Sequence, residues 1–411
     1  MTDIEFQIYD WTERDIALES TIDSDEEQIP KKYQIQVFGR TMDGKSVYCK
    51  INGFTPHFYL KVSDKWNKRN VKDMVKYLKS REFRNKKIWD NLKYHLIKGD
   101  LVTRQDAYGF NGDRKYKYVR LIFNNSFAMK RFSQVFEGKV YIPGITKKMT
   151  KFKLYESNIL PMLRCFHILD IKGCSWVKIN KDDYEIIKDD DKDSYTDIEI
   201  AIHWKNIKPI EKDTNAPLRI ASFDIECYSA DDSFPQAYRK SDAVIQIGTT
   251  YTYLGESVPY RQHIVTLKGC SPIKDVIVES YEKEKDVIKA WIKEIVDNDC
   301  DILTGYNIFY FDEKYIYDRA TLLGIIDKDT NIQLSKLKDY GCRFKEITLS
   351  SSAMGENKLR WWQTPGKVHI DLFKDVQKTY KLSSYKLDLV ASHFIRGSIK
   401  NVLKKENKWV L

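Results

Sequence analysis

Apolar and polar residues alternate along much of the first half of the chain, as they do on strands that bury one face. The alternation runs from Tyr33 to Val37, stops at Asp43-Gly44 and resumes from Val47 to Ile51. An Asp-Gly pair between two alternating runs is a strong hairpin signal. Another strand is expected from Phe54 to Val62, so this half of the chain begins as a sheet.

The pattern changes between Lys65 and Lys98. This stretch has twelve Lys and Arg residues against three Asp and Glu residues, and its apolar residues Val71, Val75 and Leu78 recur at helical spacing. It therefore predicts a basic helix. Its charges either follow the phosphates of a nucleic acid or form a solvated face, and both interpretations stay open.

A strand from Tyr116 to Phe123 continues the β-rich region, and Pro209 to Pro217 has the composition of a connector. We place the main boundary near Asn215. The prediction is a β-rich N-terminal domain over residues 1–214 and a second domain over residues 215–411.

Beyond the boundary, strand and helix patterns alternate. In chain order they predict strands at Leu218–Cys227, Val244–Gly248 and around Ile264, a helix at Lys285–Asp297, a strand at Ile302–Tyr306 and a helix from Glu313 to Leu323. Such an order indicates a sheet covered by helices rather than a sandwich. The expected fold class is α/β and α+β.

Composition points to an intracellular protein with a polyanionic partner. The formal net charge is +10, and the seven cysteines are scattered without CxxC or zinc spacing, which favours free thiols in a reducing compartment. The first ten residues lack the apolar stretch of a signal peptide, and no apolar run approaches the ~20 residues of a membrane span. We expect no membrane association.

Asp224 and Glu226, in Phe223-Asp224-Ile225-Glu226, are the clearest candidates for chemistry. Their spacing on a strand places both carboxylates on one face, with Cα atoms about 7 Å apart. We expect this strand to be buried on both faces, where carboxylates need a cation or another strong partner. The alternative is an edge strand with solvated carboxylates.

The tripeptide Asp-Ile-Glu occurs three times, so its context must separate the copies. Asp3-Ile4-Glu5 lies near a terminus that we expect to be frayed. Asp197-Ile198-Glu199 lies on an alternating strand whose acidic side chains we expect to face water. Both copies are interpreted as structural, and Asp224-Ile225-Glu226 is the copy assigned to chemistry.

Asp312 is a third candidate, because it ends the segment Tyr306–Asp312 between a short strand and a helix. At a helix N-terminus the macrodipole favours the ionised carboxyl group, which would keep it ready to bind a cation. The simpler alternative is an N-capping aspartate.

Together these two elements resemble the first two exonuclease motifs of family B DNA polymerases, F-D-I-E and N-x-x-x-F-D, in order and separation. Other segments are similar to delta-type polymerases and their relatives in large DNA viruses: Tyr155–Asn158, Gly173–Trp176, Leu349–Gly355, Thr364–Leu372 and Ser384–Asp388. The resemblance spans about residues 33–395. It implies a ribonuclease H-like fold for the second domain and a role in DNA replication.

The resemblance also implies a 3′→5′ proofreading exonuclease, part of a DNA-directed DNA polymerase. Two divalent ions, Mg²⁺ or Mn²⁺, would support hydrolysis of the 3′-terminal phosphodiester. Carried over by motif, Asp224 would bridge the ions, Glu226 would hold the ion that activates water, and Asp312 would bind the second ion.

Four more residues are candidates for contact with the unpaired 3′ end. Asn307 and Phe311 belong to the second motif. Trp361-Trp362 lie in a predicted hairpin, Leu349–Gln363, that turns around Gly355–Asn357 and in the family helps to separate primer from template. Tryptophan can stack on unpaired bases. Packing of the two rings on the sheet is the alternative.

The third exonuclease motif of the family, Y-x-x-x-D, should follow the second motif, and no segment after Asp312 matches it. Tyr385 and Asp388 are separated by two residues rather than three, Asp371 is expected in mid-strand and Asp388 in a helix. We therefore expect the chain to stop before this motif. Since two cations need enough carboxylates to hold them, the chain alone should be a very poor exonuclease.

Two alternative functions stay open: a stand-alone 3′→5′ nuclease with an unrecognised third aspartate, and a catalytically inactive DNA-binding or assembly module. The partners implied by the resemblance are DNA, as primer-template or a single-stranded 3′ end, the palm, fingers and thumb of the polymerase, and a sliding clamp. The implied location is the nucleus or a cytoplasmic viral factory.

Overall fold

The computed structural model describes residues 2–16, 32–106, 112–231, 233–327, 330–351 and 355–395. The chain forms two compact units, one of Met1–Lys192 with Asp197–Thr214 and the other of Asp193–Thr196 with Asn215–Leu411. Of the predicted hairpin segment, Ser352–Met354 lie outside the described residues.

The first unit contains a seven-stranded sheet. Its strands, in spatial order, are β11 (Tyr184–Ile186), β12 (Ile198–His203), β3 (Ser46–Asn52), β2 (Lys32–Arg40), β1 (Ile4–Ile16), β10 (Trp176–Ile179) and β13 (Ile207–Ile210). The predicted hairpin is confirmed, since β2 and β3 pair antiparallel and Gly44 takes the positive φ of +84° in the turn. Helix α4 (Pro161–Leu169) buries Cys165 and Phe166 against this sheet, and η2 (Asp189–Asp191) is a single turn.

The first Asp-Ile-Glu copy is ordered, so the prediction of a frayed terminus is wrong. Ile4 begins β1 and pairs with Ile179 of β10. The Asp3 carboxylate accepts the N–H of Lys181 at 2.9 Å and lies 2.8 Å from Lys178 Nζ. Main-chain pairing with a distant strand holds this end in the sheet, which local sequence could not indicate.

The second copy is also corrected, because Glu199 does not face water. Its side chain has 0% exposure, and Glu199 Oε1 lies 2.6 Å from Lys50 Nζ. Asp197 Oδ2 accepts the Ser46 N–H at 2.8 Å. Strand β12 lies parallel to β3, so a lysine from a distant part of the sequence neutralises the buried carboxylate.

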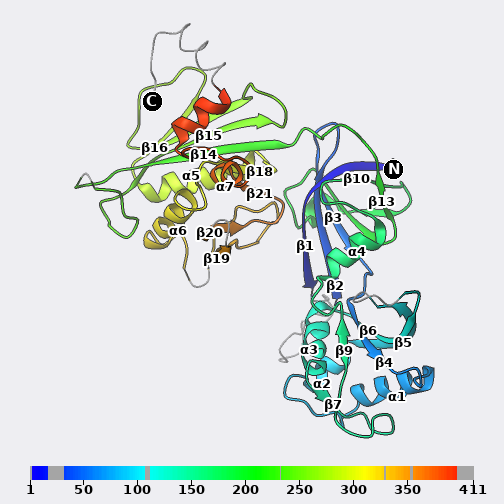
Figure 1. Cartoon of the computed structure of the whole chain (residues 1–411). Helices are drawn as coiled ribbons and strands as arrows, with labels where there is room; N and C mark the ends of the chain where they lie inside the picture. Colours follow the sequence, from blue (N-terminus) through cyan, green and yellow to red (C-terminus); the bar gives the residue numbers. More distant parts are fainter. Residues whose placement is uncertain are drawn as a thin grey trace. The chain divides into compact units, whose positions relative to one another are not determined.

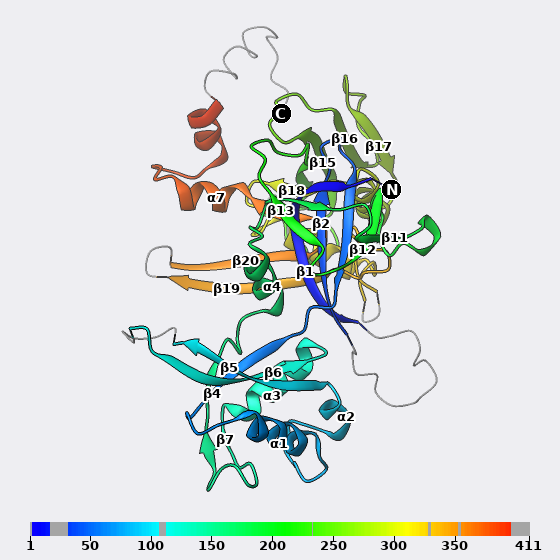
Figure 2. The same cartoon turned by 90° about the vertical axis from the view of Figure 1, so that its right-hand side faces the viewer.

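A four-stranded sheet forms the rest of the first unit, in the order β5 (Leu96–Gln105), β6 (Lys115–Phe123), β4 (His57–Val62) and β9 (Lys153–Tyr155). Helices α1 (Lys68–Lys79), α2 (Asp90–Lys93) and α3 (Ser126–Phe136) accompany it, and β7 (Lys139–Val140) pairs with β8 (Thr150–Lys151). Figure 2 shows α1 and α3 on the same side of this sheet. The predicted basic helix is confirmed as α1, whose Val71, Met74 and Leu78 are buried.

The second unit is built on a six-stranded mixed sheet (Figure 1). Its strands, in spatial order, are β17 (Ile277–Tyr281), β16 (Arg261–Leu267), β15 (Val244–Tyr253), β14 (Arg219–Cys227), β18 (Ile302–Gly305) and β21 (Val368–Asp371). Strand β14 is antiparallel to β15 and parallel to β18. Helices α5 (Glu284–Asp297) and α6 (Asp312–Leu322) supply Trp291 and Ile316 to the core. The α/β and α+β class is confirmed.

Strands β19 (Arg343–Ser351) and β20 (Gly355–Gln363) form the predicted hairpin, a two-stranded ribbon that Figure 2 shows extending from the unit. Helix α7 (Leu372–Thr379) follows β21, and residues 387–395 are helical. All seven cysteines have free thiols, as expected. Among the described residues, no helix is both long and apolar enough to cross a bilayer.

Candidate metal centre

Asp224 and Glu226 lie on β14, inside the sheet of the second unit. The strand alternates as predicted: Ala221, Phe223 and Ile225 are buried in the core, and Asp224 and Glu226 are exposed on the other face. Core residues of α5 and α6 cover the Phe223 face, whereas the face with Asp224 and Glu226 is exposed. The expectation that both faces are buried is therefore wrong. Two carboxylates therefore stand on an open face, where a cation or a phosphate could reach them.

Asp312 comes to the same place from the first turn of α6. The side chain is 2% exposed, and its Oδ1 accepts the N–H of Ile225 at 3.2 Å, between the two acidic residues of β14. It does not cap its own helix, since the N-cap position is Phe311. This hydrogen bond joins the two predicted motifs.

The protonation of Asp312 differs from the expectation. Burial, with a further contribution from the neighbouring Asp224 carboxylate, raises the pKa of Asp312 to about 8. The helix macrodipole acts in the opposite direction, but desolvation and like-charge repulsion outweigh it. Asp224 and Asp312 thus form a pair in which a second negative charge is unfavourable unless a cation or a proton compensates for it.

Asp371 supports the loop before Asp312 rather than acting as another ligand. It ends β21 instead of lying in mid-strand, and its carboxylate accepts the N–H of Asn307 at 2.8 Å and of Phe309 at 3.1 Å. The same carboxylate caps α7 through the N–H of Phe373 at 3.0 Å. Asn307 has a positive φ of 66°, so these bonds hold an unusual backbone conformation. Asp388 is exposed on the last described helix.

Glu313, next to Asp312, is a residue that the sequence analysis missed. It is fully buried, accepts the N–H of Trp362 at 2.9 Å and lies 2.7 Å from His369 Nδ1. The other ring nitrogen of His369 lies 2.7 Å from Thr364 Oγ1. This network fastens the hairpin and β21 to the first turn of α6. An acidic residue at a helix start gives no sequence signal of such burial.

The candidates for contact with a 3′ end have different environments. Trp362 has 0% exposure and packs against Phe344 and Tyr317, so its prediction as a stacking residue is wrong: its ring is part of the core. Trp361 is half-buried, with its ring centroid 6.0 Å from that of Phe309.

The second-motif residues lie closer to the acids. Phe311 is half-buried, and its ring centroid is 5.3 Å from those of Phe234 and Tyr315. Asn307 is the residue in the left-handed conformation described above. Both shape the loop that presents Asp312, and their contact with a substrate stays a prediction.

A cavity of about 540 Å³ opens beside Asp224. Ser222 and Asp224 form part of its wall on β14, and Tyr306, Leu372 and Leu387 form part of the wall contributed by later segments. The Tyr306 hydroxyl donates to the Tyr385 carbonyl oxygen. An acidic side chain thus borders a largely apolar hollow, a combination that suits a sugar or base next to a phosphate.

Oxygen ligands for a divalent cation are present, but they are not tightly gathered. Within the described residues, the one group of three or more ligand atoms within 4.8 Å of one another is His263, Glu279 and Glu294, which the sequence analysis did not find. Arg261 binds Glu294 through two nitrogens at 2.7 and 3.0 Å, so that group already has a cation. Asp224, Glu226 and Asp312 form a looser set.

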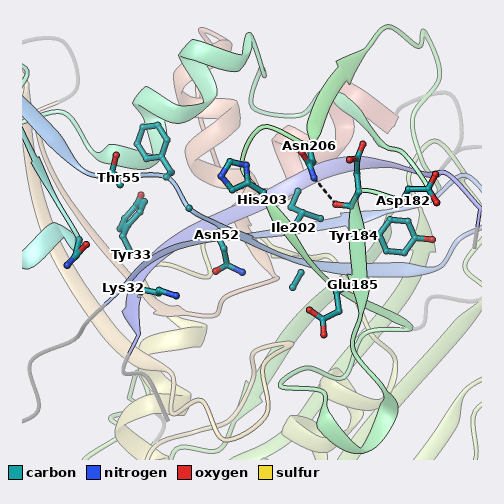
Figure 3. A pocket seen from close by; sticks show the side chains of 15 residues that line it. Lys32, Tyr33, Asn52, Thr55, Asp182, Tyr184, Glu185, Ile202, His203 and Asn206 are labelled. Carbon is teal, nitrogen blue, oxygen red and sulfur yellow. Dashed lines mark hydrogen bonds between the residues drawn. The ribbon is translucent and has the colours of Figure 1, made fainter. Parts of the chain in front are cut away.

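A second cavity lies in the first unit, far from these acids in the sequence. It has a volume of about 570 Å³, and its walls include Asn52, Tyr184 and His203. Figure 3 shows side chains from several strands around it and the hydrogen bond of Asn206, which runs from Nδ2 to the Asp183 carbonyl oxygen at 3.1 Å. None of the predicted metal ligands lines this cavity.

A known protein family matches more than half of this chain. Residues 152–390 match the sequence profile of the family described as DNA polymerase family B, exonuclease domain. This range contains all three predicted ligands.

Similar proteins come from viruses and eukaryotes. The DNA polymerase of Acanthamoeba polyphaga mimivirus is 34% identical over 472 residues, which cover 97% of this chain and 26% of that protein. The DNA polymerase delta catalytic subunit of Dictyostelium discoideum is 30% identical over 377 residues, covering 90% of this chain and 33% of that subunit. The chain thus spans between a quarter and a third of the length of these two relatives.

The fold is also similar to a solved structure. The family B DNA polymerase from the hyperthermophilic archaeon Pyrobaculum calidifontis matches with a TM-score of 0.60 and 19% sequence identity, over 95% of this chain and 39% of that one. Both the β-rich first unit and the mixed sheet of the second unit therefore have a counterpart in a single known architecture.

Proposed function

Since the chain belongs to the family B DNA polymerases and contains their exonuclease domain, we propose that its second unit is the 3′→5′ proofreading part of a replicative polymerase. The observation that carries this proposal is the meeting of Asp224 and Asp312. The exposed Asp224 carboxylate, beside a cavity, contributes to the raised pKa of the buried Asp312 carboxyl group, and such a pair of neighbouring acids suits a cation-dependent hydrolase.

The residues present fit divalent metal ions. Asp224 and Glu226 are exposed carboxylates without a basic partner in the part of the chain that the structure describes. A cation bound nearby would stabilise the ionised form of Asp312. Carboxylate oxygens are the ligands that Mg²⁺ and Mn²⁺ prefer. We assign Asp224, Glu226 and Asp312 as the residues that would hold the two ions.

When bound, the ions would supply a nucleophilic hydroxide and stabilise charge on the scissile phosphate. The chain itself positions the groups around them. Asp371 and Glu313 hold the loop and the first turn that carry Asp312. Leu372 and Leu387 offer the terminal nucleotide an apolar wall next to Asp224.

The substrate would be the single-stranded 3′ end of DNA, and the partners primer-template DNA and the polymerase's palm, fingers and thumb. A sliding clamp stays a prediction. A polymerase of this kind would act where the genome is replicated, in the nucleus or in a cytoplasmic viral factory. No Y-x-x-x-D segment follows Asp312 within these 411 residues, and we expect slow hydrolysis by them alone.

The test uses a 5′-labelled single strand with Mn²⁺ and the complete chain at high enzyme concentration. We expect slow shortening from the 3′ end that Asp224→Ala reduces by at least roughly tenfold, since the side chain holds charge needed in the transition state. Asp197→Ala, the same change in the second copy of the tripeptide, serves as the control. Equal losses in both variants, or cleavage that survives Asp224→Ala, would refute the assignment.

A further inference from the structure

The net positive charge of the chain is concentrated in one segment of the first unit. Lys65–Lys98 holds twelve Lys and Arg residues and three Asp and Glu residues, whereas the whole chain has 69 and 59. An excess of nine positive charges, against ten for the whole chain, therefore lies in this segment, which contains α1, α2 and their connection. The segment is far from the candidate metal centre in the sequence and lies in the other unit.

Helix α1 separates its apolar and charged residues. Val71, Met74 and Leu78 are buried against the four-stranded sheet. The opposite face carries four exposed lysines three or four residues apart: Lys68, Lys72, Lys76 and Lys79. Residues at this spacing form one row along a helix, so the helix presents a line of ammonium groups to the solvent.

A cavity of about 620 Å³ follows this row in the chain, lined by residues of α2 and of the segment that joins α1 to α2. Arg81, Arg84 and Lys86 line it and are exposed. Lys93, also in the lining, is 3% exposed, and its Nζ donates to the Ser80 carbonyl oxygen at 2.8 Å and to Asp90 Oδ1 at 2.9 Å. One carboxylate thus faces four cationic side chains, which makes the cavity a place for an anion.

An aromatic residue stands at this cavity. Trp89 lines it and is 39% exposed. The Arg131 guanidinium lies 5.5 Å from the centroid of the Trp89 ring, and the Phe127 ring is tilted against the same ring at 5.9 Å. Tyr94, just after α2, is 76% exposed. Two large rings are thus exposed beside arginines and lysines, a combination that proteins use to bind single-stranded nucleic acids.

We propose that this surface, defined by α1, Arg81, Arg84, Lys86 and Trp89, binds single-stranded nucleic acid. The cavity takes a backbone phosphate, the row of lysines on α1 follows further phosphates, and Trp89 stacks on an unpaired base. An acidic protein or an anionic bilayer would use the charges but not the exposed aromatic ring beside the cationic cavity. The inference does not depend on catalysis by the second unit.

The experiment measures binding of a fluorescent 20-nucleotide oligodeoxythymidylate to the complete chain by anisotropy, in EDTA, over a series of salt concentrations. The variant Arg81→Gln/Arg84→Gln/Lys86→Gln should bind roughly 100-fold more weakly at 0.1 M salt, and the slope of log K against log salt should fall by about 2, because single strands lose about 0.7 in slope for each phosphate contact removed. The matched control is Lys147→Gln/Lys148→Gln/Lys151→Gln, three exposed lysines of the same unit, which should change affinity by less than about threefold.

Trp89 tests the stacking separately from the charge. Trp89→Ala should weaken binding of the single strand by roughly 5- to 100-fold at every salt concentration without changing the slope, Trp89→Phe should restore most of it, and a duplex of the same length should not respond. Circular dichroism would verify that each variant is folded. Equal losses in the two charge variants, or competition by polyglutamate as strong as by the oligonucleotide together with no effect of Trp89→Ala, would overturn the proposal.

Discussion

Strands β12 and β14 carry the same tripeptide, Asp-Ile-Glu, in opposite surroundings. On β12 the Glu199 carboxylate is fully buried and lies 2.6 Å from Lys50 Nζ. On β14 the carboxylates of Asp224 and Glu226 are exposed and have no basic partner among the described residues. Where the fold supplies a counter-charge, the acid contributes to the structure. Where it does not, the acid stays available for a cation.

The largest expected effect tests the buried side of this comparison. Lys50→Met leaves an ionised Glu199 without its nearest cation, and removal of one partner from a buried ion pair destabilises a protein by about 3–5 kcal/mol. Urea unfolding would measure the loss. Glu226→Gln, at an exposed position of β14, should change the free energy of unfolding by less than about 0.5 kcal/mol. Similar values for both variants would remove the contrast between the strands.

Metal binding should depend on the exposed carboxylates of β14 and not on those of β12. With Mn²⁺ at about 100 times its dissociation constant, the free energy of unfolding of the unmodified chain should rise by about 2–3 kcal/mol, because the ion binds the folded state. Asp224→Asn should lose this increase, and Asp197→Asn should keep it. Thermal unfolding with Mn²⁺ and with EDTA gives both values. An increase that persists in Asp224→Asn would place the ion elsewhere.

The pH dependence of stability tests the raised pKa of Asp312, which lies beside β14. The pKa of Asp312 is raised to about 8, so ionisation is less favourable in the folded state than in the unfolded state. In the metal-free protein this carboxyl group should therefore lower stability progressively as the pH rises from about 4 to 8.

Asp312→Asn should not show that loss, since its Oδ1 can still accept the Ile225 N–H. The variant should be more stable than the unmodified chain by a few kcal/mol at pH 8, and the difference should shrink towards zero as the pH falls to about 4. Chemical unfolding at a series of pH values, in EDTA, checks the difference. A difference that does not vary with pH would contradict the assigned direction of the pKa shift.

The smallest effect belongs to the first copy of the tripeptide. Glu5 lies 2.8 Å from Lys212 Nζ and 3.6 Å from Lys178 Nζ, and all three side chains are partly exposed. Glu5→Gln should cost less than about 1 kcal/mol, and 1 M NaCl should reduce the difference further, because salt screens exposed pairs. Unfolding at two salt concentrations measures it. A loss that is large or unchanged by salt would mean that this pair resembles the one on β12.

Most elements of the second unit could be predicted because their periodicity is local. The helix expected at Lys285–Asp297 is α5 (Glu284–Asp297), and the strand expected at Leu218–Cys227 is β14 (Arg219–Cys227). The face of β14 that is covered could not be predicted, since an alternating pattern does not say where a helix from elsewhere in the chain will pack. For the same reason, the expectation that Glu199 lies on a solvent-exposed face was wrong.

The site was predictable as a set of motifs but not as a geometry. The order of Asp224, Glu226 and Asp312 indicated the family, which the match over residues 152–390 supports. The bond from Ile225 to Asp312 and the support from Asp371 join residues far apart in the chain, and no local pattern contains them. The ionisation expected for Asp312 was wrong because burial and Asp224 outweigh the helix macrodipole.

The short segment Asp193–Thr196 has a consequence for how this protein could be recombined. It interrupts the first unit in the sequence but belongs to the second, where the Tyr195 N–H donates to the Lys336 carbonyl oxygen at 2.9 Å and the Lys338 N–H donates to the Asp193 carbonyl oxygen at 2.7 Å. A gene fusion or chimera that contained residues 215–411 without residues 193–196 would lack these two main-chain hydrogen bonds. An exchange between related genes would preserve the second unit only if it carried both pieces.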